Sequence, residues 1–429
     1  SIRNGVEMWL KWEGFIEHCN DKEMFTLAYN NIMESLITMF LQRSENLEEL
    51  LINDQLMFPT VSTFLNAIPG ISQLKTLRVK LDFTNTNILE FMNALTPKAC
   101  PYLKQLNIKS YLHNDESDAL VNIIKSHKKF EKIDLDTYII GRSVVVYEIS
   151  NLASEKTIKD FFLFCGRISE FKLKKSEKDS KQIAYITFQK EIAAKTALML
   201  TNAVIGDSAL IVKSAEETGY IKIFSALKYV GNSLKELILQ YMDFSKISPD
   251  NIENISKCQN LVRISFYKCQ KMTITHCTSL SKNNLNLKKL EIIGLSFDQI
   301  VMTTLISIWG STLEVLHLDE LSQETANALL IHCSNLKELA INNLYANSLK
   351  FIYPFLQQSS LKSFIIDTHG IFPKECFDLV PNLPSTLTFL GLYTDFNSRK
   401  FKKFVKYCEK FVELKALNIK RLRFVTEKI

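Results

Sequence analysis

One hydrophobic pattern, Leu-x-x-Leu-x-Leu, recurs along most of the chain and constrains its fold more than any other feature. The copy that begins at Leu336 reads LKELAI. The other copies begin at Leu47, Leu74, Leu103, Phe130, Leu234, Leu261, Leu287, Leu313, Leu361, Leu387 and Leu414. Neighbouring copies start 23 to 29 residues apart, except for one interval of 104 residues after Phe130. Repeats of this length stack so that neighbours share one continuous core, which predicts an α/β leucine-rich repeat solenoid shaped as a horseshoe.

The long interval indicates that a separate domain is inserted into one repeat. A spacing of 27 residues accounts for part of the interval, and 77 residues are left over. The predicted organisation is a helical cap over residues 1–45, repeats over 46–141, an inserted domain over 142–216 and further repeats over 217–429. An end repeat has an apolar edge to cover, and we expect Trp9 and Trp12 of the cap to do so.

Each repeat is expected to place its leucine pattern on a short strand, followed by a helix or turn. Alternate strand residues then point outward and form a polar ladder on the concave face. The predicted protein-binding residues of this polar ladder are Arg78, Asn107, Gln240, Arg263, Tyr267, His317, Asp319, Asn342 and Tyr393, and the ladder also includes Glu49, Asp134, Glu291, Asp367 and Asn418. Because the charges are mixed in sign, the face suits a protein partner better than a polyanion.

Three repeats carry a cysteine three residues before the first leucine of the pattern. They read CPYLKQLNI from Cys100, CQNL from Cys258 and CSNL from Cys333. This arrangement resembles the cysteine-containing leucine-rich repeats of F-box proteins, and the likeness covers about residues 40–140 and 220–429. The resemblance implies an adaptor in which an N-terminal F-box docks a ubiquitin-ligase scaffold while the repeats capture a substrate. No F-box is visible from Ser1 onward, so we expect it to precede Ser1.

The segment from Ser143 to Glu216 has a different hydrophobic period. VVVYEI, ISEFKLKK, KQIAYITF and SALIVKSA alternate as strands, whereas EKTIKDFFLFCG and EIAAKTALMLTNA have helical spacing. Ser154 is placed to cap the first helix and Gly166 to end it. The predicted order βαββαβ is the ferredoxin-like split βαβ arrangement. Its two termini emerge together, so the domain fits into a loop of a repeat.

The stretch Lys181–Phe188 resembles the octapeptide of the RNA recognition motif (RRM). Lys181, Ala184, Tyr185, Ile186 and Phe188 agree with that pattern. Gln182 and Ile183 depart from it, and Val145 stands where the first strand of the family usually has an aromatic residue. The resemblance implies that the outward rings of the sheet stack on RNA bases, and here Tyr185 is the ring that remains of the usual set. Tyr147 alternates with Val145 and adds a second ring to that face.

Two functions are compatible with these patterns. Residues 142–215 hold twelve Lys and Arg against eight Asp and Glu, a net charge of +4, and outward lysines compensate for the missing rings. The first hypothesis is therefore RNA or single-stranded nucleic-acid binding by the insert, with a protein on the concave face. Its candidate RNA-binding residues are Tyr185, Lys181, Tyr147, Val145, Ile183, Lys172, Lys174 and Lys213. The alternative is an F-box/LRR-type adaptor of a ubiquitin ligase whose insert binds no RNA.

The sequence shows no pattern of an enzyme, a metal site or a membrane span. Phosphate-binding glycine loops, a nucleophile elbow and the HExxH motif are absent. The pairs His18-Cys19, His276-Cys277 and His332-Cys333 lack the CxxC spacing of a zinc site. Nine scattered cysteines indicate thiols in a reducing compartment. We therefore expect a non-enzymatic binding protein of the cytoplasm or nucleus, without cofactor or metal, and no stretch approaches the roughly 20 apolar residues that a membrane helix needs.

Overall fold

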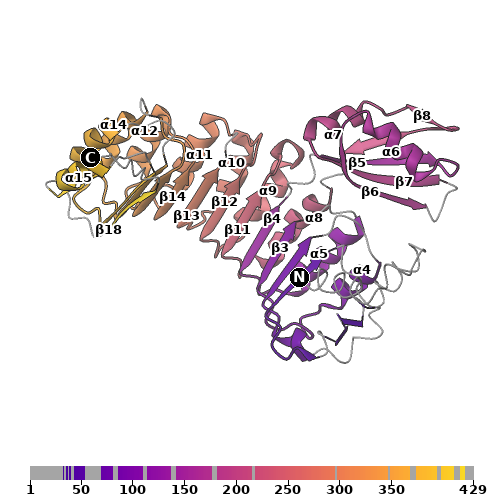
Figure 1. Cartoon of the computed structure of the whole chain (residues 1–429). Coiled ribbons are helices and arrows are strands. Elements are labelled where there is room, and N and C mark those ends of the chain that lie inside the picture. The colour runs from indigo at the N-terminus through magenta and orange to yellow at the C-terminus, as the bar shows by residue number, and fades with distance from the viewer. Residues whose placement is uncertain are drawn as a thin grey trace. The chain divides into compact units, whose positions relative to one another are not determined.

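The fold of the chain is given by a computed structural model (Figure 1). It describes residues 32, 35–36, 38–39, 43–53, 69–80, 86–109, 114–136, 142–175, 181–214, 218–294, 297–345, 348–367, 373–393, 398–409 and 416–420. Within the chain, Ser1–Val230 and Gly231–Ile429 are two compact units. Most of the predicted N-terminal cap, including Trp9 and Trp12, lies outside the described residues.

The first unit contains four parallel strands that follow each other in chain order. They are β1 (Glu49–Asn53), β2 (Thr76–Lys80), β3 (Gln105–Lys109) and β4 (Lys132–Asp136). Their register aligns Leu77 with Leu106 and Leu106 with Ile133, and all three side chains are buried. Helices α4 (Thr86–Ala94), α5 (Asn114–Ser126) and α8 (Thr218–Ala226) belong to the same unit, as do 3₁₀ turns at Pro69–Gln73 and Leu227–Val230.

The second unit repeats the same strand arrangement over its whole length. Its parallel strands are β11 (Glu236–Gln240), β12 (Arg263–Tyr267), β13 (Lys289–Ile293), β14 (Val315–Leu318), β15 (Glu338–Ile341), β16 (Ser363–Asp367), β17 (Phe389–Tyr393) and β18 (Ala416–Lys420). Its helices are α9 (Pro249–Ser256), α10 (Ile274–Ser281), α11 (Gln299–Trp309), α12 (Gln323–His332), α13 (Tyr353–Gln358), α14 (Pro373–Leu379) and α15 (Ser398–Cys408), with 3₁₀ turns at Phe244–Lys246, Leu349–Ile352 and Val380–Asn382.

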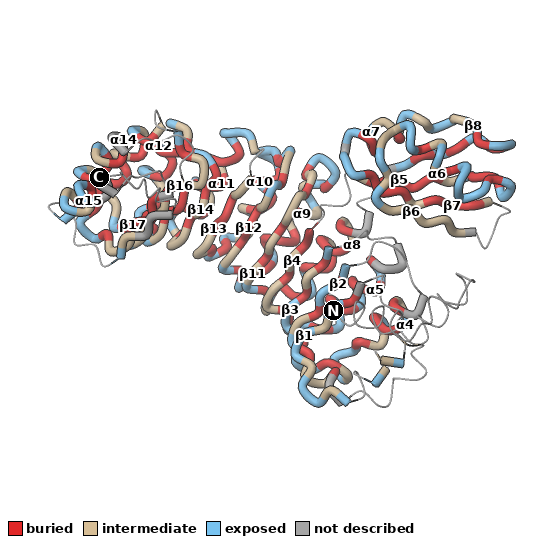
Figure 2. Tube along the Cα trace, viewed as in Figure 1, coloured by how far each residue is buried: buried red, intermediate tan, exposed pale blue. Residues whose placement is uncertain are grey.

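The leucine pattern explains this regularity. In β2 to β4 and β11 to β17 the fourth and sixth residues of the pattern are buried, as Leu290 and Ile292 are in β13. Figure 2 shows the buried residues along these strands in red. Backbone bonds repeat as well, because Glu314 N donates to Lys288 O at 2.8 Å and Lys337 N donates to Glu314 O at 2.8 Å. Each predicted strand is present where the pattern placed it.

Between β4 and α8 the chain forms a separate antiparallel sheet. Its elements are β5 (Ser143–Ser150), α6 (Glu155–Leu163), β6 (Ile168–Lys175), β7 (Lys181–Phe188), α7 (Glu191–Leu198), β8 (Val204–Ile205), β9 (Ser208–Ala209) and β10 (Ile211–Ser214). The sheet order is β10-β5-β7-β6, as the predicted βαββαβ arrangement requires. The expected last strand, Ser208–Ala215, differs from the prediction because β8 and β9 form a small hairpin and β10 continues from it. Gly206, with φ of 69°, makes the turn of that hairpin.

The predicted helix signals of the inserted domain are present. The hydroxyl of Ser154 accepts a hydrogen bond from Thr157 N at 3.1 Å and caps α6. A Cβ atom at Gly166 would lie only 2.6 Å from Cβ of Ala193, so glycine lets the end of α6 approach α7. Ile158 and Phe162 of α6 are buried against the sheet.

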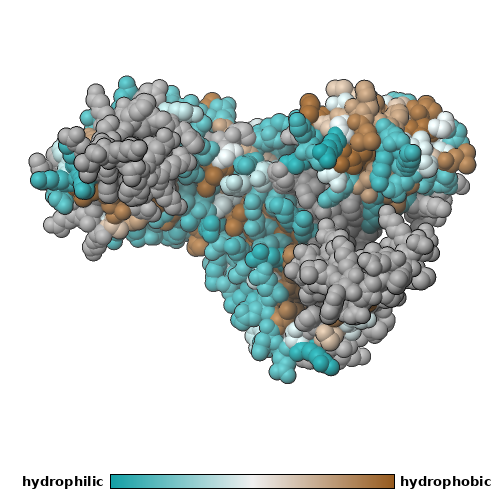
Figure 3. Space-filling view, viewed as in Figure 1, coloured by the Kyte–Doolittle hydropathy of each residue, from teal (hydrophilic) through white to brown (hydrophobic). Residues whose placement is uncertain are grey.

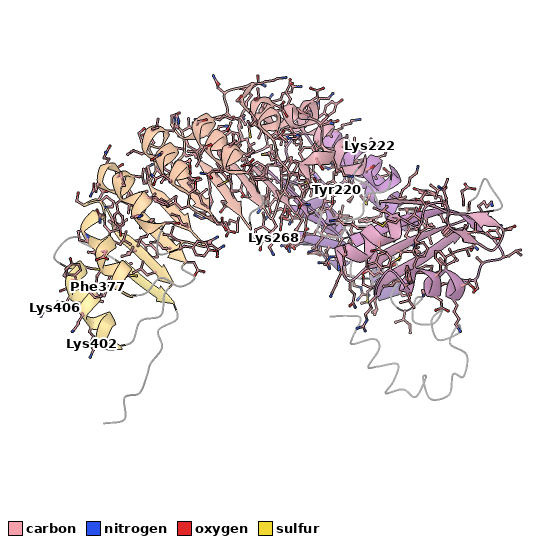
Figure 4. The ribbon with its side chains drawn as sticks, turned by 90° about the horizontal axis from the view of Figure 1, so that it is seen from above. Tyr220, Lys222, Lys268, Phe377, Lys402 and Lys406 are labelled. Atoms are coloured by element: carbon pink, nitrogen blue, oxygen red, sulfur yellow. The ribbon has the colours of Figure 1, made fainter. Side chains whose placement is uncertain are left out.

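The segment after the insert returns to the elements that precede it. The hydroxyl of Tyr220 in α8 donates to Asp136 O at 3.1 Å, at the end of β4. Lys222 Nζ lies 2.7 Å from Asp118 Oδ1 of α5. Both residues are labelled on α8 in Figure 4. These contacts join residues 84 and 104 positions apart, so α8 packs back onto the elements that precede the separate sheet. Insertion of the domain within a repeat stays a prediction.

Candidate nucleic-acid interface

The outer face of the inserted sheet is the side that α6 and α7 do not cover. Strand alternation places Val144, Val146 and Ile186 in the core under the helices. Val145 and Tyr185 therefore point the other way, and they are direct partners in the β5–β7 register. Lys213 pairs with Val145 from β10, and Lys172 pairs with Tyr185 from β6. One row across four strands thus reads Lys213, Val145, Tyr185, Lys172.

A small apolar cluster forms the centre of this face. Val145 is 4% exposed, and Tyr147, Ile183 and Tyr185 pack against it while each remains partly exposed. Val145 therefore supports the two tyrosines and offers little surface of its own. Ile211, two residues before Lys213, pairs with Tyr147 at the edge and is 39% exposed. The sequence interpretation left out Ile211, although its alternation with Lys213 places it on this face.

Lysines surround the two rings. Lys174 Nζ lies 5.7 Å from the ring centroid of Tyr185, and Lys213 Nζ lies 5.6 Å from that of Tyr147. These distances allow a cation–π attraction, which holds a positive charge beside each ring. The arrangement presents two π systems and several ammonium groups on one surface.

A β-bulge in β5 sets the direction of its side chains. The β5–β7 register shifts between Val146 and Ile149, and Glu148 has φ of 63°. Strict alternation after Tyr147 would place Ile149 on the outer face. The extra residue returns Ile149 to the core, where it is fully buried. Hydrophobic alternation in the sequence does not predict this bulge.

The ammonium group of Lys181 forms a hydrogen bond within the domain. Lys181 Nζ donates to Ser208 Oγ of β9 at 2.5 Å. Hydrogen bonds from Ser150 and Ser208 lower the pKa of the neighbouring Asp207, and the charge of Lys181 adds a smaller effect. Lys181 thus anchors the β8–β9 hairpin beside the sheet.

The opposite face of the domain has a different character. The helices expose the apolar residues Leu163, Phe164, Ile192 and Met199. Figure 3 shows brown apolar surface over α6 and α7. An apolar surface offers no positive charge to the phosphates of a polyanion. The basic and aromatic outer face is therefore the better candidate for a nucleic-acid interface.

Residues 144–211 match the RNA recognition motif family. This stretch lies within the predicted limits of the inserted domain, and its sheet order is the one just described. Residues 144–211 are an RRM domain.

Two curated relatives each match less than a fifth of the chain. Protein vip1 of Schizosaccharomyces pombe (strain 972 / ATCC 24843) is 38% identical over 77 residues, which are 18% of this chain and 29% of that protein. Binding partner of ACD11 1 of Arabidopsis thaliana is 36% identical over 74 residues, 17% of this chain and 27% of that protein. The chain spans less than a third of the length of each relative.

Among solved structures, the three N-terminal RNA-binding domains of the yeast splicing factor Prp24 are 21% identical to the matched part. The match covers 19% of this chain and 35% of that chain, with a TM-score of 0.18.

Outside the RRM, the polar ladder contains a charged network on the outward face of β11 to β15. Arg263 Nη2 lies 2.7 Å from Glu291 Oε2, and Arg263 Nη1 lies 3.2 Å from Glu236 Oε2. His317 Nδ1 lies 3.2 Å from Glu291 Oε1, and His317 Nε2 lies 2.7 Å from Glu338 Oε1. Much of the charge on this face is therefore neutralised internally.

The network shifts the pKa values of its central groups. Burial alone would raise the pKa of Glu291, but hydrogen bonds from His317, Ser265 and Arg263 hold it far below its usual range. Burial alone would lower the pKa of His317, but its hydrogen bonds to Glu291 and Glu338 raise it above 6.5. Both carboxylates therefore favour the charged form of His317.

The remaining predicted ladder residues lie at several depths. Arg78 pairs with Glu49 at 2.6 Å, and the Tyr267 ring meets Tyr241 edge-on at 5.8 Å. Asn107, Gln240 and Asn342 are partly exposed. Asp319 directly follows β14 and is buried, so it contributes little outward surface. The side chain of Tyr393 lies outside the described residues.

The cysteines at the repeat position serve packing. Cys100, Cys258 and Cys333 are buried free thiols, and burial raises the pKa of each to about 12. A thiol with such a pKa is a poor nucleophile at neutral pH. In the described parts of the chain, no group of His, Cys, Asp and Glu side chains could hold a metal ion. None of the helices among those parts is both long and apolar enough to cross a membrane.

Proposed function

We propose that this chain is a non-enzymatic binding protein of the cytoplasm or nucleus whose RRM binds single-stranded RNA on the outer face of its sheet. Tyr147 and Tyr185 would stack on bases, while Lys172, Lys174 and Lys213 would contact phosphates. The observation that carries the proposal is the grouping of two half-buried rings and adjacent lysines around Val145 on one face.

Single-stranded RNA fits this face better than a duplex. Bases must be unpaired and splayed to stack on protein rings, whereas duplex RNA is recognised through its minor groove and backbone. Ile183 supplies apolar contact but no π surface, and Val145 is buried beneath the rings, so each tyrosine accounts for a larger share of the affinity. Each base–aromatic stack contributes about 1–3 kcal/mol.

The test is a titration of fluorescently labelled single-stranded RNA with the full chain. Tyr185→Ala should weaken binding by about 5- to 150-fold, the equivalent of one lost stack. Tyr147→Ala should have an effect of the same order. Tyr102→Ala is the matched control, because Tyr102 is also exposed but lies outside the RRM. Equal affinities of the wild type and the two RRM variants would contradict the proposal.

We also infer that the parallel strands and their helices are leucine-rich repeats whose polar ladder binds a protein. Support comes from the strand at each Leu-x-x-Leu-x-Leu copy and from the buried cysteines at the repeat position. Because Arg263 and Glu291 form an ion pair and His317 bonds to Glu291, this face suits a protein surface with its own pattern of polar groups.

The alternative function is a substrate adaptor of the F-box/LRR type, and the buried cysteines at the repeat position support it as well. That function predicts that full-length protein isolated from cells retains a ubiquitin-ligase scaffold subunit. Isolation without any such subunit would count against the adaptor and would leave the RNA proposal unaffected.

A further inference from the structure

The net charge of the chain is distributed unevenly along the sequence. Residues 398–429 hold eleven Lys and Arg against three Asp and Glu, a net charge of +8, which exceeds the +6 of the whole chain. With the +4 of residues 142–215, the rest of the chain is left with a net charge of −6. Positive charge is therefore concentrated in two places, the RRM and the C-terminal segment.

Helix α15 is the described helix of that segment. Its eleven residues contain five Lys and Arg and no Asp or Glu. Lys402, Lys403 and Lys406 are exposed, and Figure 4 shows Lys402 and Lys406 extending from α15 away from the strands. Lys402 and Lys406 are four residues apart, so they lie on the same side of the helix and repel each other.

These three lysines differ from many lysines elsewhere in the second unit. Lys271, Lys282 and Lys337 each have a carboxylate within 2.7 Å. Among the described residues, no carboxylate forms an ion pair with any of the three α15 lysines. Their charge is therefore available to an anionic partner. We call the surface formed by these three lysines the basic face of α15.

The apolar side of α15 is already occupied. Phe404 and Cys408 are buried, and the ring of Phe377 in α14 lies 5.4 Å from Phe404 and 5.5 Å from Tyr407. A helix that lies in a membrane surface buries its apolar side among lipid chains. Because α14 covers that side here, a partner recognised by charge alone, such as a phosphodiester backbone, fits better than a bilayer.

From these observations we propose that the basic face of α15 is a second RNA contact, at which Lys402, Lys403 and Lys406 bind backbone phosphates. The inference rests on the proposed RNA-binding function of the RRM. It extends that function to longer single strands, because a strand engaged by two sites gains effective concentration at the second site. Phosphate contacts carry no base preference, so this site adds affinity without sequence specificity.

The test measures binding of the full chain to RNA of about 6 nucleotides and of about 40 nucleotides. The short RNA can occupy only one small site, whereas the long RNA extends beyond it. Lys402→Gln/Lys403→Gln/Lys406→Gln should weaken binding of the long RNA on the order of 10-fold and leave the short RNA unaffected. The slope of log affinity against log salt should fall by about 2, since each single-strand phosphate contact contributes about 0.7.

A matched control separates a local contact from a general loss of charge. Lys98, Lys128 and Lys129 are also exposed and lie outside both basic regions. Changing these three to Gln removes the same charge and should alter neither affinity nor slope. Arginine at positions 402, 403 and 406 should restore binding, because it keeps the charge.

The outcomes distinguish this inference from the proposed function. If the α15 variant binds like the wild type while Tyr147→Ala/Tyr185→Ala loses affinity, the α15 contact is wrong and the RRM proposal stands. If the α15 variant loses affinity for RNA while Tyr147→Ala/Tyr185→Ala binds like the wild type, the RRM face is rejected and the α15 contact stands. Binding to phosphatidylserine vesicles that depends on the three lysines, without any binding of RNA, would overturn both.

Discussion

Gln182 holds the loop between β5 and α6 through two hydrogen bonds from its side-chain amide. Its Nε2 donates to Ser150 O at 2.8 Å and to Ala153 O at 2.9 Å, and the side chain is buried. The RRM octapeptide has glycine at this position, so the departure noted in the sequence has a structural cause. Nothing in the local sequence identifies these two carbonyl groups as partners, since they lie 32 and 29 residues away.

Gln182→Ala should destabilise the RRM by about 1–3 kcal/mol, because two hydrogen bonds of a buried side chain are lost. Amide hydrogen exchange of β5 and β7 in the full chain measures this as a lower free energy of opening. Gln189→Ala is the control, because Gln189 is exposed and makes only a backbone bond, to Arg167 O. Equal opening energies for the two variants would contradict the role of Gln182.

His317 should titrate above 6.5 in the folded protein, since Glu291 and Glu338 stabilise its charged form. A raised pKa means that this stabilisation is complete below 6.5, the value in the unfolded chain, and is lost as pH rises through the folded value. The pKa of Glu291 is lowered, so its contribution is present above 4.5 and is lost only at much lower pH.

The measurement is an NMR titration of the histidine rings, with His317→Gln used to assign the His317 signal. The midpoint should lie above 6.5 and should fall in Glu338→Gln, which removes one of the two negative charges beside the imidazole ring. A midpoint at or below 6.5 in the wild type would show that burial outweighs the two carboxylates.

At the scale of elements, periodicity predicted the strands well and their ends less well. The fourth and sixth residues of the leucine pattern are buried in β2 to β4 and β11 to β17, so a single spacing predicted the positions of these parallel strands. The β8–β9 hairpin and the bulge at Glu148 could not be predicted in this way. Both depend on positive φ angles, at Gly206 and Glu148, that hydrophobic alternation does not encode.

In the candidate site, too, some features could be predicted from the sequence and others could not. Alternation correctly grouped Tyr147, Tyr185, Lys172, Lys174 and Lys213 on one face, because side chains two residues apart on a strand share a side. It could not show that Lys181 bonds to Ser208 or that Val145 lies beneath the rings. Those facts depend on contacts between elements that are distant in the sequence.

The close approach of α6 and α7 gives a prediction about packing. In Gly166→Ala the new methyl would lie 2.6 Å from Cβ of Ala193, so the helices must separate and the RRM should lose roughly 1–3 kcal/mol of stability. Hydrogen exchange of the core amides of β5 and β7 measures the loss.

A double-mutant cycle tests the cause. Ala193→Gly removes the methyl that the new side chain meets, so Gly166→Ala should cost less in that background than in the wild type. Strictly additive effects would show that the cost arises elsewhere than at this contact.

At the scale of the whole molecule, the chain combines an RRM with two sets of parallel strands whose outward charges are largely paired. The RRM and α15 carry the positive charge that remains. This division predicts that RNA protects the RRM sheet and α15 and leaves the polar ladder of the second unit unchanged.

Hydrogen exchange of the full chain with and without single-stranded RNA tests this division most directly. The account predicts slower exchange in β5 and β7 when RNA is bound, in α15 when the RNA is long, and no change in β11 to β15. Slower exchange in β11 to β15, with β5 and β7 unchanged at saturating RNA, would contradict it.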